Sequence, residues 1–362
     1  MMRSLYVHIP FCREICSYCD FCKVYYKQQW VDDYLIQLKK ELEDKHLPFS
    51  LYTIYIGGGT PTSLTVHQLK YLMDTLKPYT YKVKEYTIEV NPETVDEEKL
   101  KILFDGGITR LSIGVQTFQE KLLKPINRKH KNKDVFKIIQ QAKKIGFQNI
   151  SIDLMYGIPY QTQNDIIQDL NILKTLDIQH VSYYSLILED NTILSFQNYQ
   201  PIDEQEEAEI YEYIQQSLDE IGFHKYEVSN FAQEGYESLH NKVYWHYGDY
   251  DGVGLGAHGI VQGIRYENTR SLTSYLQGHY LKEQENIDVE DQMFEMIMMG
   301  LRLVEGVSLE RFYQCFHKNI FDVYEVAISK HCDLGLLVCE NGYLKTTVQG
   351  MELLHEILID FL

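Results

Sequence analysis

The sequence predicts an α/β fold of six strand–helix units, followed by a small C-terminal α+β part. Between residue 4 and about residue 188, short runs rich in β-branched and aromatic residues alternate with helical stretches. Strands that alternate with helices of this length form βαβ units and a parallel sheet. Polar and glycine-rich motifs follow the strands one after another. Because such folds carry their sites at the carboxyl ends of the strands, the motifs are expected to meet there.

This alternation predicts the positions of the strands and helices between residue 4 and about residue 188. The strands are expected at Leu5–Ile9, Thr53–Ile56, Tyr86–Val90, Arg110–Val115, Ile150–Met155 and Val181–Leu188. The helices between them are expected near 30–45, 65–77, 95–105, 133–145 and 163–176. A polar, acidic segment at 190–208 is interpreted as a connection into a helix near 205–221, since charge runs of this kind usually form a solvated face.

The pattern changes from about residue 285. Helices are expected at Asp291–Leu303, near 308–316 and near 320–333, with a final helix over about 349–361. Asn341-Gly342 lies between two apolar runs, which is a strong signal for a β-hairpin. Helices with one hairpin indicate a small winged-helix-like unit. The expected division is therefore a core at 1–220, a connecting segment at 221–285 and a C-terminal unit at 286–362.

Composition and charge narrow the class of protein. The chain has 362 residues, 44% of them hydrophobic, and a formal net charge of −18. An acidic surface repels the phosphate backbone, so nucleic acid is not expected as a partner. No apolar run approaches the roughly 20 residues that a membrane-spanning helix needs. The N-terminus does not resemble a signal peptide, so a cytoplasmic location is expected.

Three cysteines near the start, Cys12, Cys16 and Cys19, have the spacing C-x3-C-x2-C. Zinc ribbons usually need a second cysteine pair, and disulfides need an oxidising compartment. Thiolates are suitable ligands of iron–sulfur clusters. Three ligands on a [4Fe-4S] cluster leave one iron open to a small molecule, which indicates a catalytic type of cluster. Cys22 is expected to be a free or packed thiol.

With Tyr18 before the third cysteine, this motif resembles the signature of the radical S-adenosylmethionine (SAM) superfamily. The flanking run from Tyr6 to Cys12, Tyr-Val-His-Ile-Pro-Phe-Cys, is similar to one branch, the oxygen-independent coproporphyrinogen III oxidases and the related haem chaperones. The resemblance covers nearly the whole chain. It implies a partial (β/α)6 TIM-like barrel that binds a four-iron cluster and SAM.

The resemblance also implies which residues bind these cofactors. Gly58, Gly59 and Thr60 match the loop that binds the methionine amino group of SAM, and Arg128 matches an arginine near the SAM carboxylate. The remaining expected cofactor-binding residues are Tyr6, Tyr18, Glu89, Gln116 and Asp153. Some of these residues have a structural alternative when taken alone. The glycines suit a tight turn, Glu89 suits a helix cap, and Arg128 begins a basic run that could be solvated.

The run His240-Asn241-x-x-Tyr244-Trp245 resembles a sequence that marks the haem-chaperone branch. Histidine is a common axial ligand of haem iron, although a lone histidine beside aromatic residues is more often packed and hydrogen-bonded. The Gly252–Gly259 segment is common to both branches. The oxidases are expected to carry an N-terminal extension and a fourth cysteine two residues after the third, whereas here the loop begins at Cys12 and that position is Phe21.

The resemblance therefore implies a haem chaperone that carries haem as cargo to acceptor haemoproteins, with membrane-bound respiratory proteins as the expected acceptors. The alternative is a coproporphyrinogen III dehydrogenase, which would remove two propionate carboxyl groups from its substrate by radical chemistry. Whether the chain is an enzyme, which residues are the axial haem ligands and what its oligomeric state is stay open at this point.

Overall fold

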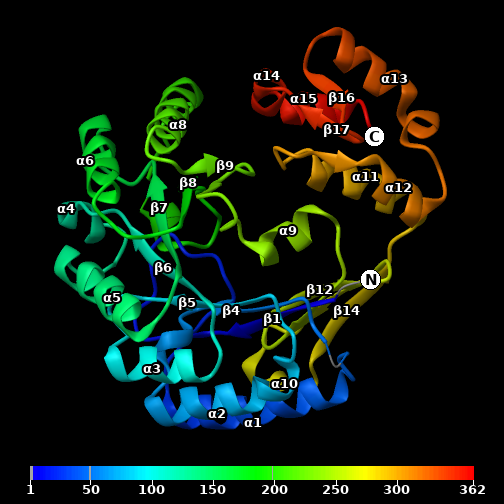
Figure 1. Ribbon diagram of the computed structural model, residues 1–362. Helices are drawn as coiled ribbons and strands as arrows, with labels where there is room; N and C mark the ends of the chain where they lie inside the picture. Colours follow the sequence, from blue (N-terminus) through cyan, green and yellow to red (C-terminus); the bar gives the residue numbers. More distant parts are fainter. Residues whose placement is uncertain (1–2, 49, 198) are drawn as a thin grey trace.

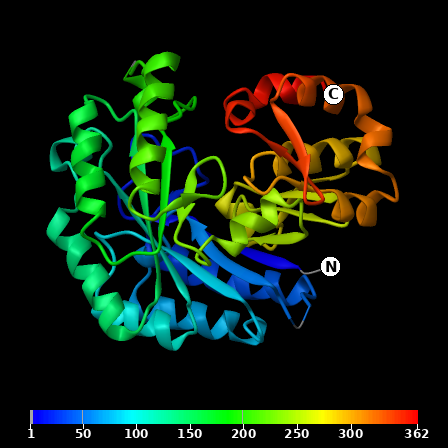
Figure 2. The ribbon, with the colours of Figure 1, turned by 45° about the horizontal axis from the view of Figure 1, so that its top comes forward.

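The computed structural model of the chain describes residues 3–48, 50–197 and 199–362. Within these residues the main element is a twelve-stranded mixed sheet with the strand order β14-β13-β12-β11-β1-β4-β5-β6-β7-β8-β10-β9. The sheet curves into an open barrel with helices along its outer face, and the C-terminal part of the chain lies beside it (Figures 1 and 2).

Six neighbouring strands in the middle of the sheet run parallel to one another. They are β1 (Ser4–Ile9), β4 (Thr53–Gly58), β5 (Glu85–Val90), β6 (Arg110–Gln116), β7 (Asn149–Tyr156) and β8 (His180–Ser185). The helices that follow them along the chain are α1 (Gln28–Asp44), α2 (Val66–Leu76), α3 (Glu97–Asp105), α5 (Asn132–Ile145), α6 (Gln163–Leu173) and α8 (Glu204–Asp219). The predicted α/β fold is thus confirmed, although β8 ends three residues before the predicted strand did.

Local sequence signals explain where several of these helices begin. Thr65 and Thr162 form capping boxes at the starts of α2 and α6, and the carboxylate of Asp96 accepts a hydrogen bond at the start of α3. These caps satisfy backbone N–H groups that a helix start leaves without partners. The apolar faces of the helices and strands then form one large buried core.

The sheet is larger than the six predicted strands. At one edge β10 (Asn230–Ala232) and β9 (His224–Lys225) add in antiparallel orientation. At the other edge β11 (Tyr250–Val253) pairs in parallel with β1, and three antiparallel strands follow. They are β12 (His258–Val261), β13 (Ile264–Asn268) and β14 (Leu281–Asn286). The helices α9 (Leu239–Trp245) and α10 (Leu272–Leu276) also lie in the region that the sequence analysis called a connecting segment.

The C-terminal part has its own apolar core, distinct from that of the barrel. It contains α11 (Val289–Gly300), α12 (Leu309–Phe316) and α13 (Ile320–Asp333), packed with the sheet β15 (Val307–Ser308), β17 (Tyr343–Thr346) and β16 (Leu337–Glu340). Asn341 and Gly342 have φ values of 52° and 81°, as a two-residue hairpin turn requires. The predicted single last helix is wrong, because the chain leaves helical geometry at Leu353 between α14 (Val348–Glu352) and α15 (Leu354–Ile359).

The remaining elements are short. They are β2 (Phe11–Cys12), β3 (Val24–Tyr25), α4 (Glu120–Leu123), α7 (Ile193–Phe196) and the 3-10 turns Pro61–Ser63 and Lys77–Tyr79. The helix α7 falls inside 190–208, the segment predicted as a plain connection, of which residue 198 lies outside the described residues. In the part of the chain that the structure describes, no helix has both the length and the apolar character that crossing a membrane demands.

Candidate functional site

The cysteine motif forms a closed loop at the carboxyl end of β1. Its two ends pair as the short parallel strands β2 and β3, and the backbone N–H of Val24 donates to the carbonyl oxygen of Pro10 at 2.8 Å. Cys12 is buried, whereas Cys16 and Cys19 are half-buried, and all three are free thiols. The loop therefore brings the three sulfur atoms to one side of a fixed backbone.

These cysteines line a cavity of about 150 Å³, called the cysteine cavity below. Most of the residues that the sequence analysis selected meet in its wall. They are Tyr18, Gly58, Gly59, Thr60, Glu89, Gln116, Arg128 and Asp153. Tyr6 and His240 lie outside this wall, in neighbouring cavities described below. The ordered placement of polar residues at successive strand ends thus produces a single shared site.

The donor set at Cys12 suits a metal cluster. Burial raises the pKa of the Cys12 thiol to about 12, so an ionised sulfur here needs a positive partner. The hydroxyl of Thr60 lies 3.6 Å from its sulfur atom. A Cβ atom at Gly59 would lie 2.9 Å from the same sulfur and 2.6 Å from the oxygen of Pro10. Only glycine leaves room for this close approach.

The described residues do not form a site for a single metal ion. Among the residues described, no three His, Cys, Asp or Glu side chains converge on one point as ligands of one ion. A cubane cluster asks for another geometry, since each cysteine binds its own iron atom. Three thiols spaced around one cavity fit that requirement.

Two partly buried carboxylates line the same cavity. Glu89 accepts hydrogen bonds from the Tyr55 hydroxyl at 3.0 Å and from the backbone N–H of Gly58 at 3.1 Å. Asp153 accepts from the hydroxyl of Ser112, 3.0 Å from each carboxylate oxygen. Burial, and then the neighbouring Asp153, raise the pKa of Glu89 to about 7, and burial also raises the pKa of Asp153.

The register of the sheet explains why these carboxylates are close. Glu89 on β5 lies opposite Ser112 on β6, and Gly114 on β6 lies opposite Asp153 on β7. The two acids thus flank one strand and face the same cavity. Ionised carboxylates in a buried wall are costly without a positive partner. A ligand with cationic groups, such as the amine and sulfonium of SAM, supplies that partner, so this wall fits SAM.

Gln116 takes an unusual backbone conformation at the end of β6. Its φ is 69°, and the sheet has an irregularity between Gly114 and Gln116. The Tyr184 hydroxyl donates to its side-chain oxygen at 2.9 Å. Such irregularities often re-aim a side chain at a site, and here the amide is turned toward the cysteine cavity.

Arg128 is buried rather than solvated, so the basic-run alternative for this residue is wrong. Its guanidinium pairs with Glu93 through Nε at 3.1 Å and Nη2 at 3.2 Å. Nη2 also donates to the carbonyl oxygen of Gly114 at 2.6 Å and to the Asn91 side chain. Against the effect of burial, His130 and Arg128 hold the pKa of Glu93 well below its usual range. The bidentate partner of Arg128 is thus an internal carboxylate.

A second and larger cavity, of about 540 Å³, opens between the barrel and the C-terminal part. It is called the aromatic cavity below, because tyrosine, tryptophan and phenylalanine form much of its wall. These residues are Tyr6, Phe21, Tyr244, Trp245, Tyr247 and Tyr250. Met298 and Met299 of α11 face it from the other side, and Arg265, Arg270 and His258 add polar groups.

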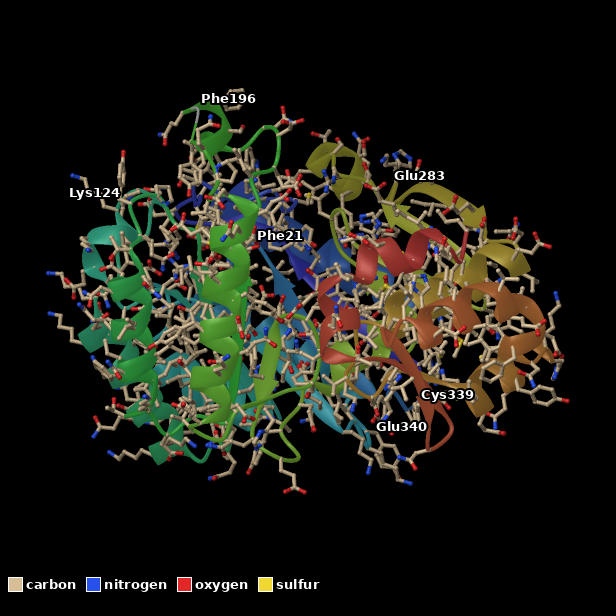
Figure 3. The ribbon with its side chains drawn as sticks, turned by 90° about the horizontal axis from the view of Figure 1, so that it is seen from above. Phe21, Lys124, Phe196, Glu283, Cys339 and Glu340 are labelled. Carbon is tan, nitrogen blue, oxygen red and sulfur yellow. The ribbon has the colours of Figure 1, made fainter. Side chains whose placement is uncertain are left out.

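The two cavities are neighbours. Phe21, two residues after Cys19, is 69% exposed and lines both of them. It also lines a smaller cavity of about 200 Å³, together with Tyr6, Glu89, His240 and Tyr244. Figure 3 shows Phe21 between the barrel and the C-terminal part. The cysteine loop therefore forms the boundary between a polar site and an aromatic one.

His240 is packed and hydrogen-bonded on all sides. Its Nδ1 lies 2.7 Å from the Thr53 hydroxyl, and its Nε2 lies 2.7 Å from the Tyr244 hydroxyl. Its ring stacks on Tyr55 with a centroid distance of 5.1 Å. Burial lowers the pKa of His240 to about 3, so the ring is neutral. In this arrangement neither nitrogen is available to a metal.

Three residues of these walls, Tyr55, Ser112 and Tyr184, were not predicted from the sequence. Their hydroxyl groups donate to three predicted site residues, namely Glu89, Asp153 and Gln116 in that order. Their signal was a polar residue inside an otherwise apolar strand. That signal is weak in this chain, since its 29 tyrosines are spread throughout.

Comparison with known proteins agrees with this arrangement. The family model "Radical SAM superfamily" matches residues 6–173, and the model "HemN C-terminal domain" matches residues 287–353. Among curated proteins, the chain is similar to "Heme chaperone HemW" of Bacillus subtilis, with 41% identity over 100% of this chain and 99% of the relative.

Two further relatives carry the same name. The protein of Lactococcus lactis is 38% identical over 99% of this chain and 97% of the relative, and that of Escherichia coli is 33% identical over 99% and 98%. Among solved structures, the coproporphyrinogen III oxidase HemN from Escherichia coli matches with a TM-score of 0.87. That match covers 99% of this chain and 90% of the other at 24% identity, and it shows that the two folds are alike.

Proposed function

Because this chain belongs to the HemW family of radical SAM proteins, we propose that it is a haem chaperone, which binds haem and passes it to acceptor haemoproteins. The observation that carries the proposal is the aromatic cavity, placed against the cysteine loop and walled in part by Tyr244 and Trp245 of the run that begins at His240. Such a cavity suits a flat, largely apolar ligand with a few charged groups.

The cysteine cavity is proposed to hold the cluster and SAM. Cys12, Cys16 and Cys19 are the cluster ligands, and the loop Gly58–Thr60 gives a ligand close access to the backbone. Glu89 and Asp153 face the positive groups of SAM, while Gln116 and Arg128 supply hydrogen-bond donors. When bound, a reduced cluster with SAM supplies a 5′-deoxyadenosyl radical; the residues named here bind, orient and shield the reactants.

Haem is proposed to lie in the aromatic cavity. The volume of this cavity, about 540 Å³, falls within the roughly 300–1,000 Å³ of typical ligand pockets. The rings of Tyr244, Trp245 and Tyr250 offer stacking surfaces for a porphyrin. Arg270 is the freer of the two arginines in the wall. It approaches Glu267 only at 3.8 Å, whereas Arg265 pairs with Glu285 at 3.0 Å and Glu295 at 2.5 Å. We assign Arg270 to a haem propionate.

The geometry favours a structural role for His240 and a ligand role for another histidine. Both ring nitrogens of His240 are engaged, and so are those of His8, which contact the Tyr6 hydroxyl at 3.0 Å and the carbonyl oxygen of Cys22 at 2.8 Å. His258 instead has only a 3.9 Å approach to Glu267 and is half-exposed at the cavity. We therefore propose His258 as the axial ligand that the chain supplies, with His240 orienting Tyr244.

Haem titration tests this placement. The protein is titrated anaerobically with haem while the Soret band is followed, and His258→Ala, His240→Ala and Arg270→Ala are compared with the parent chain. We expect His258→Ala to shift the band maximum, and Arg270→Ala to weaken binding without a shift. As a matched control, Arg13→Ala removes an arginine that lies over Tyr26, outside the aromatic cavity, and should bind haem normally.

The proposed function has consequences for the acceptor of haem and for the location of the protein. A carrier of haem has to release it to another protein, and membrane-bound respiratory haemoproteins are the proposed acceptors. The cluster cysteines favour a reducing, cytoplasmic setting. An anaerobic transfer assay with an apo-haemoprotein would measure the release step directly.

A further inference from the structure

A buried carboxylate inside the barrel has no part in the function proposed so far. Glu85 is the first residue of β5, is 4% exposed, and lies opposite Thr53 of β4. Within the described residues, no Lys, Arg or His side chain forms an ion pair with it. A buried carboxylate is costly unless other groups replace the lost water. The hydrogen-bond partners of Glu85 therefore indicate its role.

These partners are at the start of α9. The backbone N–H of Leu239 donates to one carboxylate oxygen of Glu85 at 2.9 Å, and that of His240 donates to the other at 3.1 Å. The hydroxyl of Ser238 donates to Glu85 at 3.4 Å and accepts from the backbone N–H of Asn241 at 3.3 Å. The first three N–H groups of α9, which no helix can satisfy internally, thus all have partners.

The geometry suits an ionised carboxylate. The start of a helix carries a partial positive charge, and a carboxylate accepts strong hydrogen bonds from backbone N–H groups there. The helix thus takes the place of a basic side chain. In return, Glu85 holds a helix of only seven residues. Because a helix this short is not stable alone in water, its position depends on such contacts.

The contacts of α9 continue from Glu85 to the aromatic cavity. The His240 ring lies 2.7 Å from the hydroxyl of Thr53 on one side and 2.7 Å from that of Tyr244 on the other. Tyr244 and Trp245 then line the aromatic cavity, to which Glu85 itself does not contribute. A carboxylate at the start of β5 is thereby connected to an aromatic wall one to two helical turns away.

We propose that Glu85 is a positioning residue of the haem site, which fixes the start of α9 inside the barrel so that Tyr244 and Trp245 form a preformed wall. A preformed wall favours binding because less freedom is lost when the ligand enters. The inference rests on the proposed haem site. The placement of α9, however, is a property of the haem-free protein and is measured without haem.

The alternative is that Glu85 serves only the stability of the fold. Asp165 provides the comparison, since it is also a buried carboxylate at a helix start. It is 1% exposed, accepts from the backbone N–H of Thr162 at 2.9 Å and pairs with Lys121 at 2.7 Å. It belongs to α6, on the outer face of the barrel (Figure 1), and does not line the aromatic cavity. Asp165→Asn is therefore the matched control.

The two tryptophans of the chain make a specific test possible. Trp245 is on α9 and Trp30 is on α1, so in a W30F background all tryptophan emission comes from α9. Glu85→Gln and Asp165→Asn are compared in this background on the full chain. The emission maximum and its quenching by acrylamide are measured without haem. Haem is then titrated while the Soret band is followed, and unfolding in urea gives the stability of each variant.

Glu85→Gln places an amide, with one acceptor oxygen and an NH2 donor, against two N–H donors of α9. We expect a red-shifted emission and stronger acrylamide quenching before haem is added. Haem affinity should fall by on the order of tenfold, the effect of one lost hydrogen bond to a charged group. The Soret maximum should stay in place, because the proposed axial ligand, His258, is not on α9. Asp165→Asn should lose stability but keep the emission and the haem affinity of the parent chain.

Unchanged Trp245 emission and haem affinity in Glu85→Gln would overturn the proposal. Equal changes in Asp165→Asn would also overturn it, because they would trace both effects to lost stability. If Glu85→Gln does not fold, Ser238→Ala decides, since it removes the capping hydroxyl from the same helix start and should shift the emission in the same direction. An unchanged emission in Ser238→Ala would then contradict the proposal. If the parent chain binds no haem, the proposed function fails, while the emission of the haem-free variants still decides on Glu85.

Discussion

The Nε2 atom of His240 lies 2.7 Å from the hydroxyl oxygen of Tyr244, one helical turn further along α9. The two residues that bracket the His-Asn-x-x-Tyr run therefore hold each other, and Tyr244 in turn lines the aromatic cavity. The run is better explained as a way of fixing an aromatic wall than as a direct metal ligand.

This relationship predicts the effect of substitutions at His240. His240→Ala removes the hydrogen-bond partner of the Tyr244 hydroxyl and one of the two partners of the Thr53 hydroxyl, which still donates to Ser4, so we expect stability to fall by about 1–3 kcal/mol. Haem affinity should fall with the Soret maximum in place. Tyr244→Phe keeps the ring and removes the bond, so it should cause a smaller loss. A shifted maximum in His240→Ala would show instead that His240 binds the iron.

The cluster assignment predicts that three of four neighbouring cysteines are needed to bind the cluster and that the fourth is not. Replacing Cys12, Cys16 or Cys19 with Ala should abolish cluster iron and its visible absorption after anaerobic reconstitution. Cys22→Ala should retain both, since the Cys22 side chain lines the aromatic cavity rather than the cysteine cavity. Loss of the cluster from Cys22→Ala with retention in Cys19→Ala would refute the assignment.

SAM binding is predicted to depend on Gln116. The amide is turned into the cysteine cavity by the backbone irregularity at the end of β6, so Gln116→Ala should weaken SAM binding by roughly tenfold, the effect of one hydrogen bond to a charged group. The perturbation of the EPR spectrum of the reduced cluster by SAM measures it. Gln140→Ala, at an exposed position of α5, is the matched control. A spectrum that saturating SAM leaves unchanged in the parent chain would contradict the site.

The burial of Glu227 predicts that the stability of the folded protein depends on pH. Glu227 is fully buried, and its backbone forms an isolated antiparallel β-bridge with Leu303. Burial raises the pKa of its carboxyl group from 4.5 to about 7. Between these values the folded protein binds a proton that the unfolded chain releases. The contribution of Glu227 to stability therefore falls as pH rises from about 4.5 to 7. Glu227→Gln should stabilise the protein at pH 8 by about 2 kcal/mol, with little change at pH 4.5.

Denaturant unfolding at a series of pH values checks this expectation. Glu234→Gln makes the same change at an exposed position and should show no such pH-dependent gain. A stabilisation by Glu227→Gln that is equal at low and high pH would show that folding does not raise the pKa of Glu227.

Much of the barrel could be predicted because its strands and helices follow local rules. Strand β1 is an apolar run before a cysteine loop, and α2 begins at a capping threonine. The strands β11 to β14 could not be predicted in this way. All six residues of β14 are exposed and polar residues dominate it, so it shows no alternation, and it exists as a strand only because β13 pairs with it.

The residues of the candidate site likewise differ in whether local sequence patterns predict them. Glu89, Gln116 and Asp153 are recognisable because each is a polar residue near the end of a buried strand. The burial and pairing of Arg128 could not be predicted from the sequence. Its guanidinium pairs with Glu93, which lies 35 residues away in the chain. The wall that Met298 and Met299 add to the aromatic cavity is likewise a matter of tertiary packing, because α11 belongs to the other core.

Anaerobic assays with haem and with coproporphyrinogen III, run side by side on the same cluster-loaded protein with SAM and a reductant, test the central claim most directly. We predict stoichiometric haem binding with a shifted Soret band and no release of carbon dioxide from coproporphyrinogen III. Carbon dioxide released over multiple turnovers, with no haem bound, would contradict the chaperone account and identify the chain as a dehydrogenase.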